Sequence, residues 1–78
     1  MRTVIIYTTP ACPWCHKVKD YLRKKNVPFK EVDVMADSAG AGEMIAKSGQ
    51  SGVPVVDIEG NIIIGFDKGS IDRMLDLN

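Results

Sequence analysis

The first apolar run of the chain predicts a buried strand that leads through a loop into an amphipathic helix. Residues 3–7 are continuously apolar after Thr3 and rich in β-branched side chains, which is typical of a strand buried on both faces. A loop is expected over residues 8–11. Pro13 suits the first position of a helix, where its missing N–H costs nothing, and this helix is expected to end near Asn26. Its inward stripe would be Cys15, Val18, Tyr21 and Leu22, with Lys17, Lys19, Asp20, Arg23 and Lys24 facing water.

The middle of the chain predicts a second strand and a second helix. Valines alternate with acidic residues within residues 29–34, which is typical of a half-exposed edge strand. The following helix is expected to be capped by Asp37 or Ser38 and to end at Gly49. Its glycines each cost about 1 kcal/mol relative to alanine. Its inward side chains would be Ala41, Met44 and Ile45.

The last third predicts a β-hairpin and a short helix. Residues 54–58 and 62–64 are short apolar strands, joined by the turn-forming sequence Glu59-Gly60-Asn61. Asp67 is placed to cap the final helix, and Phe66 just before it is placed to form a hydrophobic staple. The inward side chains of this helix would be Ile71, Met74 and Leu75.

The resulting order, β-α-β-α-β-β-α, predicts one α/β domain over residues 1–78, with a four-stranded mixed sheet and three helices. The first β-α-β unit requires a right-handed crossover between parallel strands, whereas the hairpin strands are antiparallel. The continuously apolar first strand belongs in the interior of the sheet. This arrangement places Cys12 at the carboxyl end of a central strand, where open α/β sheets carry their sites.

Charge and hydropathy exclude several classes of function. Ten basic and ten acidic residues cancel, so net charge gives no reason to expect nucleic acid or an anionic membrane as a partner. No apolar run approaches the roughly 20 residues that a membrane helix needs. Met1-Arg2-Thr3 leads into the first strand without the apolar region of a signal peptide. We therefore expect a cytoplasmic monomer that binds neither nucleic acid nor a membrane.

Cys12 and Cys15 are the two cysteines of the chain. In a reducing cytoplasm an isolated C-x-x-C pair is more often catalytic or metal-binding than structural. Cys12 would lie at a helix start, where unpaired N–H groups and the helix dipole stabilise a thiolate. Cys15 falls on the buried stripe almost one turn later. The spacing predicts that Cys12 attacks a substrate disulfide and that Cys15 resolves the mixed disulfide.

Three motifs closely resemble the glutaredoxin family, and most of all its short bacterial and archaeal members. The resemblance covers essentially the whole chain, and it implies a thioredoxin fold and thiol–disulfide oxidoreductase activity on protein or glutathione mixed disulfides. It also implies no tightly bound cofactor and glutathione as co-substrate. The motifs are Tyr7-Thr8-Thr9-Pro10 leading to Cys12-Pro13-Trp14-Cys15, then Gln50-Ser51-Gly52-Val53-Pro54, then Gly65-Phe66-Asp67.

The resemblance implies binding roles outside the cysteine pair. Val53-Pro54 resembles the family's cis-proline segment, in which the backbone of Val53 faces a bound thiol peptide. Gly65-Phe66-Asp67 resembles the turn that holds the γ-glutamyl carboxylate of glutathione. Gln50 falls where a side chain can contact the other carboxylate, with Lys47 as a reserve. Trp14, on the side of the helix opposite Cys15, is expected to be an exposed aromatic platform for the partner.

The chain also departs from the family pattern. Trp14 stands where typical glutaredoxins have tyrosine, and no lysine or arginine lies shortly before Cys12. The usual Gly-Gly pair before the final turn is replaced by Ile64-Gly65. Short redoxins that serve ribonucleotide reductase share this build and take electrons from thioredoxin reductase. We therefore expect glutathione, thioredoxin reductase or both as electron donors, and disulfide-containing proteins, ribonucleotide reductase among them, as substrates.

Two other functions would also use the cysteines. An iron–sulfur or metal-delivery module would use Cys12 from each chain of a dimer, because two cysteines and His16 cannot close a four-coordinate zinc site alone. Cys12 to His16 also matches the C-x-x-C-H pattern of haem attachment. The predicted strands disagree with the all-helical fold expected of a small cytochrome. We expect no metal ligands in a single chain.

Overall fold

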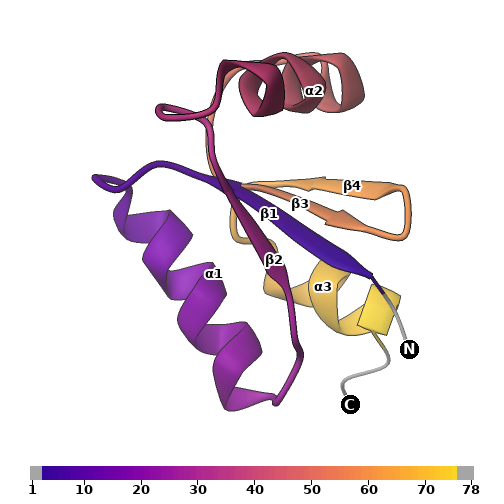
Figure 1. Cartoon of the computed structure of the whole chain (residues 1–78). Coiled ribbons are helices and arrows are strands. Elements are labelled where there is room, and N and C mark those ends of the chain that lie inside the picture. Colours follow the sequence, from indigo (N-terminus) through magenta and orange to yellow (C-terminus); the bar gives the residue numbers. More distant parts are fainter. Residues whose placement is uncertain (1–2, 76–78) are drawn as a thin grey trace.

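A four-stranded mixed sheet separates two layers of helices in the computed structural model, which describes residues 3–75 (Figure 1). One helix covers the upper face in this view, and the other two cover the lower face. The element order is the predicted β-α-β-α-β-β-α. The elements are β1 (Val4–Thr8), α1 (Pro13–Lys24), β2 (Lys30–Asp33), α2 (Ser38–Ser48), β3 (Val55–Ile58), β4 (Asn61–Ile64) and α3 (Lys68–Leu75).

Strand β1 lies in the interior of the sheet, as its apolar run predicted. The strand order is β2-β1-β3-β4. β1 pairs in parallel with β2 and antiparallel with β3, and β3 pairs antiparallel with β4. The predicted edge position of the second strand is also confirmed. Because α1 follows β1 directly, the carboxyl end of β1 and the amino end of α1 meet at one edge of the molecule (Figure 1).

Alternate side chains of β1 contribute to two apolar clusters. Ile6 packs with Val18 and Leu22 of α1 and with Ile71 of α3 in the larger cluster. Tyr7 packs with residues of α2 and β3 in the smaller one. Successive side chains of a strand point to opposite faces of the sheet. β1, the strand that leads into the cysteine loop, therefore packs against both helical layers.

A polar cluster around Lys47 holds α2 against the sheet. Lys47 Nζ lies 2.8 Å from the Tyr7 hydroxyl, 2.8 Å from Asp57 Oδ2 and 2.9 Å from Glu43 Oε1. The Tyr7 hydroxyl donates to Glu43 at 2.8 Å. These hydrogen bonds, led by the one to Asp57, raise the pKa of Lys47. The Lys47 side chain is thus a charged anchor on the α2 face of the sheet.

The capping and turn predictions are largely confirmed. Asp37 caps α2 by accepting a hydrogen bond from the Gly40 N–H at 2.9 Å, and Gly49 ends the helix with a φ of 74°. Glu59 and Gly60 both have positive φ, which is typical of a two-residue hairpin turn. Asp67 caps α3 by accepting from the Ser70 N–H at 3.2 Å.

Some boundary and burial predictions were wrong. The first strand begins one residue later than expected and includes Thr8, which is buried because β1 continues its pairing with β2 up to that residue. The second strand covers only Lys30–Asp33. Ile45 and Met74 were expected inward but are 46% and 37% exposed, because the core contacts of each short helix fall on a narrower face than the sequence pattern indicated.

Candidate active site

Cys12 lies at the N-cap of α1, directly after the loop that leaves β1. Its backbone is extended, with φ −102° and ψ 107°, and its Sγ accepts a hydrogen bond from the Cys15 N–H at 3.1 Å. The first turn of α1 carries no acidic side chain. A thiolate at Cys12 would therefore meet an N–H donor and the positive end of the helix dipole without a nearby carboxylate in that turn.

Cys15 has the opposite environment. Its side chain is completely buried, whereas Cys12 is partly exposed. Burial, followed by the hydrogen bond with Cys12, raises the pKa of the Cys15 thiol to about 11, although a backbone hydrogen bond from Thr9 and the charge of Lys19 act in the other direction. Cys15 is therefore a protonated thiol at neutral pH, and only the sulfur of Cys12 is open to a partner.

The Val53–Pro54 peptide bond is cis, as the resemblance implied. Cys12 Sγ lies 3.9 Å from the Val53 carbonyl oxygen, so this segment stands directly across from the exposed sulfur. The Pro54 carbonyl accepts a hydrogen bond from the Gly65 N–H at 2.9 Å. This bond joins the cis-proline segment to the turn that leaves β4.

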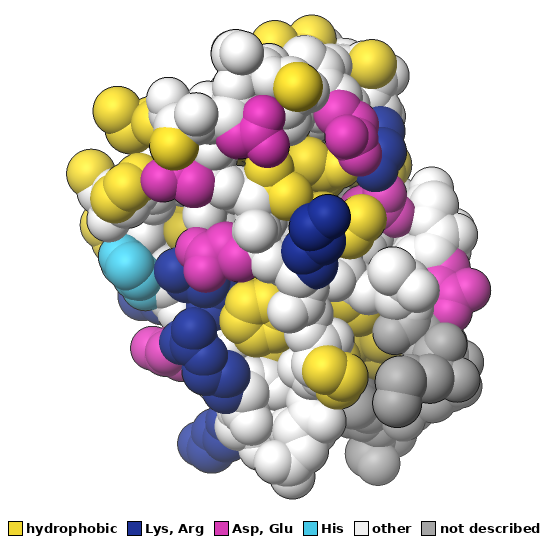
Figure 2. Space-filling view, viewed as in Figure 1, with side chains coloured by type: hydrophobic (Ala, Val, Ile, Leu, Met, Phe, Trp, Pro, Cys, Tyr) yellow, Lys and Arg dark blue, Asp and Glu magenta, His cyan; other side chains and the backbone are white. Residues whose placement is uncertain are grey.

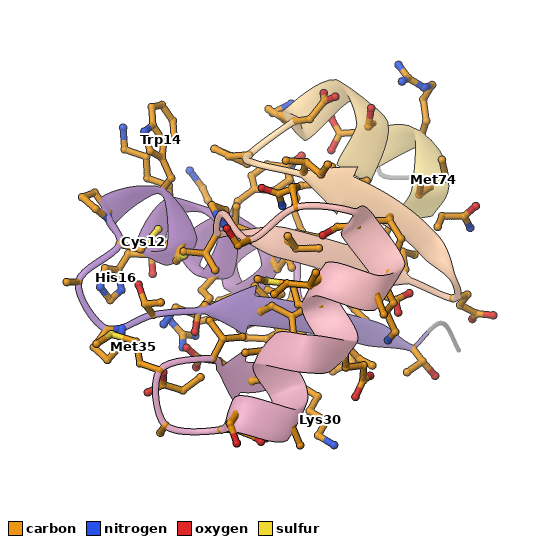
Figure 3. All side chains as sticks on the ribbon, turned by 90° about the horizontal axis from the view of Figure 1, so that it is seen from above. Cys12, Trp14, His16, Lys30, Met35 and Met74 are labelled. Atoms are coloured by element: carbon orange, nitrogen blue, oxygen red, sulfur yellow. The ribbon has the colours of Figure 1, made fainter. Side chains whose placement is uncertain are left out.

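A shallow groove of about 280 Å³ lies between the amino end of α1 and the turn after β4. The Trp14 side chain is 55% exposed, and the Nζ of Lys17 lies 4.2 Å from the centre of its ring. Figure 3 shows Trp14 and Cys12 projecting at the same edge of the molecule. Aromatic side chains thus stand beside the cis-proline segment. The groove is lined by Trp14, Val53, Pro54, Gly65 and Phe66.

Asp67 stands at the amino end of α3, next to the groove residues Gly65 and Phe66. Its carboxylate accepts hydrogen bonds from the Ser70 hydroxyl at 2.8 Å and the Ser70 N–H at 3.2 Å. These bonds, with the hydroxyl contributing most, hold the pKa of Asp67 below its ordinary value. The Asp67 side chain is therefore an ionised helix cap, two residues after Gly65, which turns with a φ of 79°.

The structure does not bring Gln50 or Lys47 into the groove lining. The Gln50 amide donates to the Gly52 carbonyl at 3.0 Å and accepts from the Gly52 N–H at 2.7 Å. A ligand contact from the Gln50 amide would compete with these bonds. The expectation that Lys47 serves as a reserve contact is wrong, because its ammonium is bound by Asp57 and Tyr7 on the α2 face of the sheet.

The sequence pattern did not predict the ion pair between Lys19, which is buried, and Glu31, whose side chain is 38% exposed. Lys19 was expected to face water, yet it is only 8% exposed, and its Nζ lies 2.7 Å from Glu31 Oε2. The Thr8 hydroxyl donates to the same carboxylate oxygen at 2.8 Å. The signal was present in the sequence, because Lys19 follows Cys15 by four residues and therefore shares its helix face.

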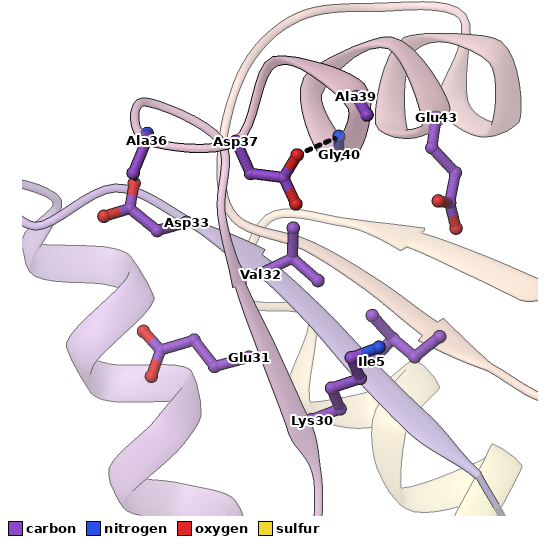
Figure 4. Close-up of a pocket in the computed structure, with 10 residues that line it drawn as sticks. All are labelled: Ile5, Lys30, Glu31, Val32, Asp33, Ala36, Asp37, Ala39, Gly40 and Glu43. Carbon is purple, nitrogen blue, oxygen red and sulfur yellow. Dashed lines mark hydrogen bonds between the residues drawn. The ribbon is translucent and has the colours of Figure 1, made fainter.

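A second hollow, of about 310 Å³, lies between β2 and the start of α2 (Figure 4). Two of its carboxylates serve local backbone, since Asp33 accepts from the Met35 N–H at 2.9 Å and Asp37 caps α2. Within residues 3–75, no group of three or more His, Cys, Asp or Glu side chains is arranged to hold a metal ion. The hollow is lined by Ile5, Lys30, Glu31, Val32, Asp33, Ala36, Asp37, Ala39, Gly40 and Glu43.

Figure 2 shows Lys and Arg side chains over α1 and carboxylates above them, around β2 and α2, with acidic side chains also beside the α1 lysines and basic side chains also among the upper carboxylates. The active-site helix therefore presents a basic flank. Within the described part of the chain, no helix combines the length and the apolar character needed to cross a membrane.

Comparisons with known proteins agree with this arrangement. The Glutaredoxin family model matches residues 4–63. The chain is 52% identical over 71 residues to a protein of Clostridium pasteurianum described as an uncharacterized glutaredoxin-like 8.6 kDa protein in the rubredoxin operon, covering 91% of this chain and 95% of that protein. It is 37% identical over 82 residues to Glutaredoxin 3 of Escherichia coli (strain K12), covering 96% of this chain and 99% of that protein.

Solved structures confirm the thioredoxin-like fold. The crystal structure of the thioredoxin-like protein BC3987 superimposes on this chain with a TM-score of 0.86. The two sequences are 31% identical, and the match covers 91% of this chain and 97% of that chain. The glutaredoxin-like protein NrdH-redoxin from Escherichia coli is 27% identical, with a TM-score of 0.83 and coverage of 91% of this chain and 92% of that chain.

Proposed function

Because the chain belongs to the glutaredoxin family of thiol–disulfide oxidoreductases, we propose that it reduces protein and glutathione mixed disulfides through Cys12 and Cys15. The observation that carries this proposal is the contrast between the two sulfurs. Cys12 is partly exposed and accepts an N–H hydrogen bond at the start of α1, whereas Cys15 is a buried thiol whose N–H supplies that bond.

The reaction has two exchange steps. The Cys12 thiolate attacks one sulfur of the substrate R–S–S–R′, and R′–S⁻ leaves and takes up a proton, so that Cys12–S–S–R remains. Cys15 then loses its proton and attacks Cys12 Sγ, and R–SH leaves. The protein ends with a Cys12–Cys15 disulfide, and two electrons have passed to the substrate. The electron donor later reduces this disulfide by the same exchanges in reverse.

The groove is the proposed docking site for the parts of the substrate that flank its reacting sulfur. A disulfide sulfur at Cys12 would lie within reach of the Val53 backbone, since the Val53 carbonyl is 3.9 Å from Cys12 Sγ. The substrate chain would then lie along the Trp14 and Phe66 side chains. We assign Trp14, Val53, Pro54, Gly65 and Phe66 to substrate binding on this basis.

Glutathione is one proposed electron donor and co-substrate. Its γ-glutamyl carboxylate could bind N–H groups at the turn before α3, where a helix start favours an anion. The ionised Asp67 could pair with the ammonium at the same end of the tripeptide. The other carboxylate has weaker support, because Gln50 is bonded to Gly52 and no lysine or arginine within residues 3–75 lines the groove. This asymmetry favours weak glutathione binding.

Thioredoxin reductase is the second proposed donor, at least as effective as glutathione. The structural similarity to NrdH-redoxin, a glutaredoxin-like protein described as having a thioredoxin-like activity profile, supports this choice. It also supports disulfide-bearing proteins as substrates, and the resemblance to short redoxins that serve ribonucleotide reductase makes that enzyme one proposed substrate. The lack of a charged contact to the other glutathione carboxylate weakens the binding free energy of glutathione by roughly 1.5–3 kcal/mol, or its affinity by about one to two orders of magnitude.

One coupled assay tests the donor. NADPH oxidation is followed with a disulfide substrate, once with glutathione and glutathione reductase and once with thioredoxin reductase. We expect measurable turnover with glutathione, and equal or faster turnover with thioredoxin reductase. Efficient turnover with glutathione alone would contradict the proposed donor preference. Failure of both donors would contradict the oxidoreductase proposal and would return attention to a metal-delivery role for Cys12.

A further inference from the structure

We propose that the Lys19–Glu31 ion pair controls the second exchange step, with Lys19 stabilising the Cys15 thiolate as it attacks and Glu31 holding Lys19 in place and moderating its charge. The inference rests on the proposed dithiol reaction. It concerns two residues that act on Cys15 without contacting the substrate. Neither residue lines the groove beside Cys12. Both are therefore positioning residues and do not contact the substrate.

The geometry brings the pair close to Cys15. Lys19 follows Cys15 by four residues on α1, and side chains at this spacing are neighbours on a helix. Cys15 is 0% exposed and Lys19 is 8% exposed, so little water separates or screens them. Glu31, on β2, receives the Lys19 ammonium at 2.7 Å and the Thr8 hydroxyl at 2.8 Å.

Stability alone gives little reason for this burial. A lysine on a helix surface normally keeps its ammonium in water, as Lys17 and Lys24 do on the same helix. The Lys19 ammonium loses most of its hydration here, while the Glu31 side chain stays 38% exposed, and this desolvation offsets much of what the ion pair contributes to stability. The position of the Lys19 charge, one turn behind the resolving cysteine, is consistent with a role in the chemistry.

The charged and polar groups around Cys15 act in a definite direction. Lys19 and the Thr9 backbone lower the pKa of the Cys15 thiol, whereas burial and Cys12 raise it. The hydrogen bond from Lys19 is the largest influence that lowers the pKa of Glu31, to which Thr8 and Arg23 also contribute. Glu31 is therefore ionised at neutral pH, and it partly offsets the field of Lys19 at Cys15.

This field is needed in the second exchange. The balanced step is Cys15–SH plus Cys12–S–S–R giving the Cys12–Cys15 disulfide plus R–SH, with the Cys15 proton passing to the departing thiolate. The thiolate of Cys15 is the attacking species. A positive charge beside the sulfur increases the fraction of thiolate at a given pH. The rate of the second step should therefore follow the net charge of the Lys19–Glu31 pair.

Opposite substitutions in the pair give opposite expected effects. Lys19→Met removes the positive charge and leaves the carboxylate, so the second step should slow. Glu31→Gln keeps a hydrogen-bond acceptor for Lys19 and Thr8 but removes the negative charge, so the second step should accelerate. Lys19→Arg retains the charge and should stay close to wild type. A purely structural role would make the Lys19 and Glu31 changes act in the same direction.

The experiment mixes the reduced full-length protein with dithiobis(nitrobenzoate) in a stopped-flow instrument across a pH series. The first thionitrobenzoate leaves at a rate proportional to reagent concentration and reports attack by Cys12. The second leaves in a concentration-independent phase and reports attack by Cys15. Lys24→Met serves as the control, because it removes an exposed lysine from the same helix.

We expect Lys19→Met to slow the second phase about tenfold and to move its pH midpoint upward, since a close opposite charge shifts a pKa by about one unit or more. Glu31→Gln should speed the second phase at neutral pH and move the midpoint downward. The first phase and the Lys24→Met control should change less than about twofold, the scale of an exposed charge.

Two results would overturn the inference: an unchanged second phase in Lys19→Met, or an upward or absent shift of the midpoint in Glu31→Gln. If Lys19→Met does not fold, the direction of the midpoint shift in Glu31→Gln still decides the question. A wild-type protein without any concentration-independent second phase would instead contradict the proposed dithiol function.

Discussion

The backbone N–H of Cys15 donates a hydrogen bond to the Sγ of Cys12 at 3.1 Å, while the Cys15 side chain is completely buried behind it. The second cysteine therefore supports the first through its backbone before its own sulfur takes part. The two thiols therefore differ in solvent accessibility and in protonation, although less than one helical turn separates the two residues. Each of the first two predictions tests one side of that separation.

Replacing the cysteines one at a time should separate the two exchange steps. Cys12→Ser should abolish disulfide reduction with either donor, because it removes the nucleophile. Cys15→Ser should keep the first exchange and accumulate a mixed disulfide on Cys12, which intact-protein mass spectrometry detects as an added thiol mass. Equal trapping of substrate on both single variants would contradict the assigned roles.

Burial of the Cys15 thiol should make the reduced protein less stable at alkaline pH. Below its ordinary pKa of 9.0 the thiol is protonated in both folded and unfolded states. From there to about 11 the unfolded state loses the proton first, so the free energy of unfolding falls as pH rises. The loss attributable to Cys15 is at most about 3 kcal/mol.

Urea unfolding of the reduced protein at several pH values measures this effect. The matched variant is Cys15→Ser, which has no thiol at that position and therefore isolates the contribution of Cys15 from that of the lysines and tyrosines. The stability of the wild type should fall more steeply than that of the variant over this range. If the free energy of unfolding falls equally with pH in the two proteins, burial does not raise the pKa of the Cys15 thiol as described.

Truncating the aromatic wall of the groove should weaken substrate docking without unfolding the protein. The Trp14 side chain is 55% exposed, so Trp14→Ala should change stability little but should reduce kcat/KM for a protein disulfide about tenfold, on the order of 1–2 kcal/mol. Met35→Ala is the control, because Met35 is 74% exposed and lies outside the groove lining. A loss of similar size in both variants would argue against a specific role for Trp14.

The two glycines inside α2 should respond oppositely to alanine. A Cβ at Gly40 would lie 2.5 Å from Cγ1 of Val32, a stiff β-branched neighbour, whereas a Cβ at Gly42 meets nothing within 4 Å. Gly42→Ala should therefore stabilise the protein by about 1 kcal/mol through helix propensity. Gly40→Ala should destabilise it by about 1–2 kcal/mol through overpacking. Chemical denaturation measures both, and a gain from Gly40→Ala would contradict the close approach of α2 to β2.

The order of the elements and the position of Cys12 were predictable because they depend on short segments. Apolar continuity identified β1, proline at position 13 marked the start of α1, and Asp37 and Asp67 marked two further helix starts. Each of these signals acts within a few residues along the chain. The cis state of Val53–Pro54 was implied by a motif resemblance, since isolated proline residues are mostly trans.

The sequence alone therefore determined the layers of the fold, the exposed Cys12 and the buried Cys15, because periodicity and helix capping are local properties. Only the tertiary structure decided that Lys19 is buried against Glu31, that Lys47 is bound to Asp57 and lies outside the groove lining, and that Gln50 is bonded to Gly52. Glu31 and Asp57 lie on other elements than the lysines they bind, and the loop geometry around Gln50 is set by how its ends are held. The environment of a polar side chain thus depends on the partners that folding brings to it, which a pattern along the chain does not specify.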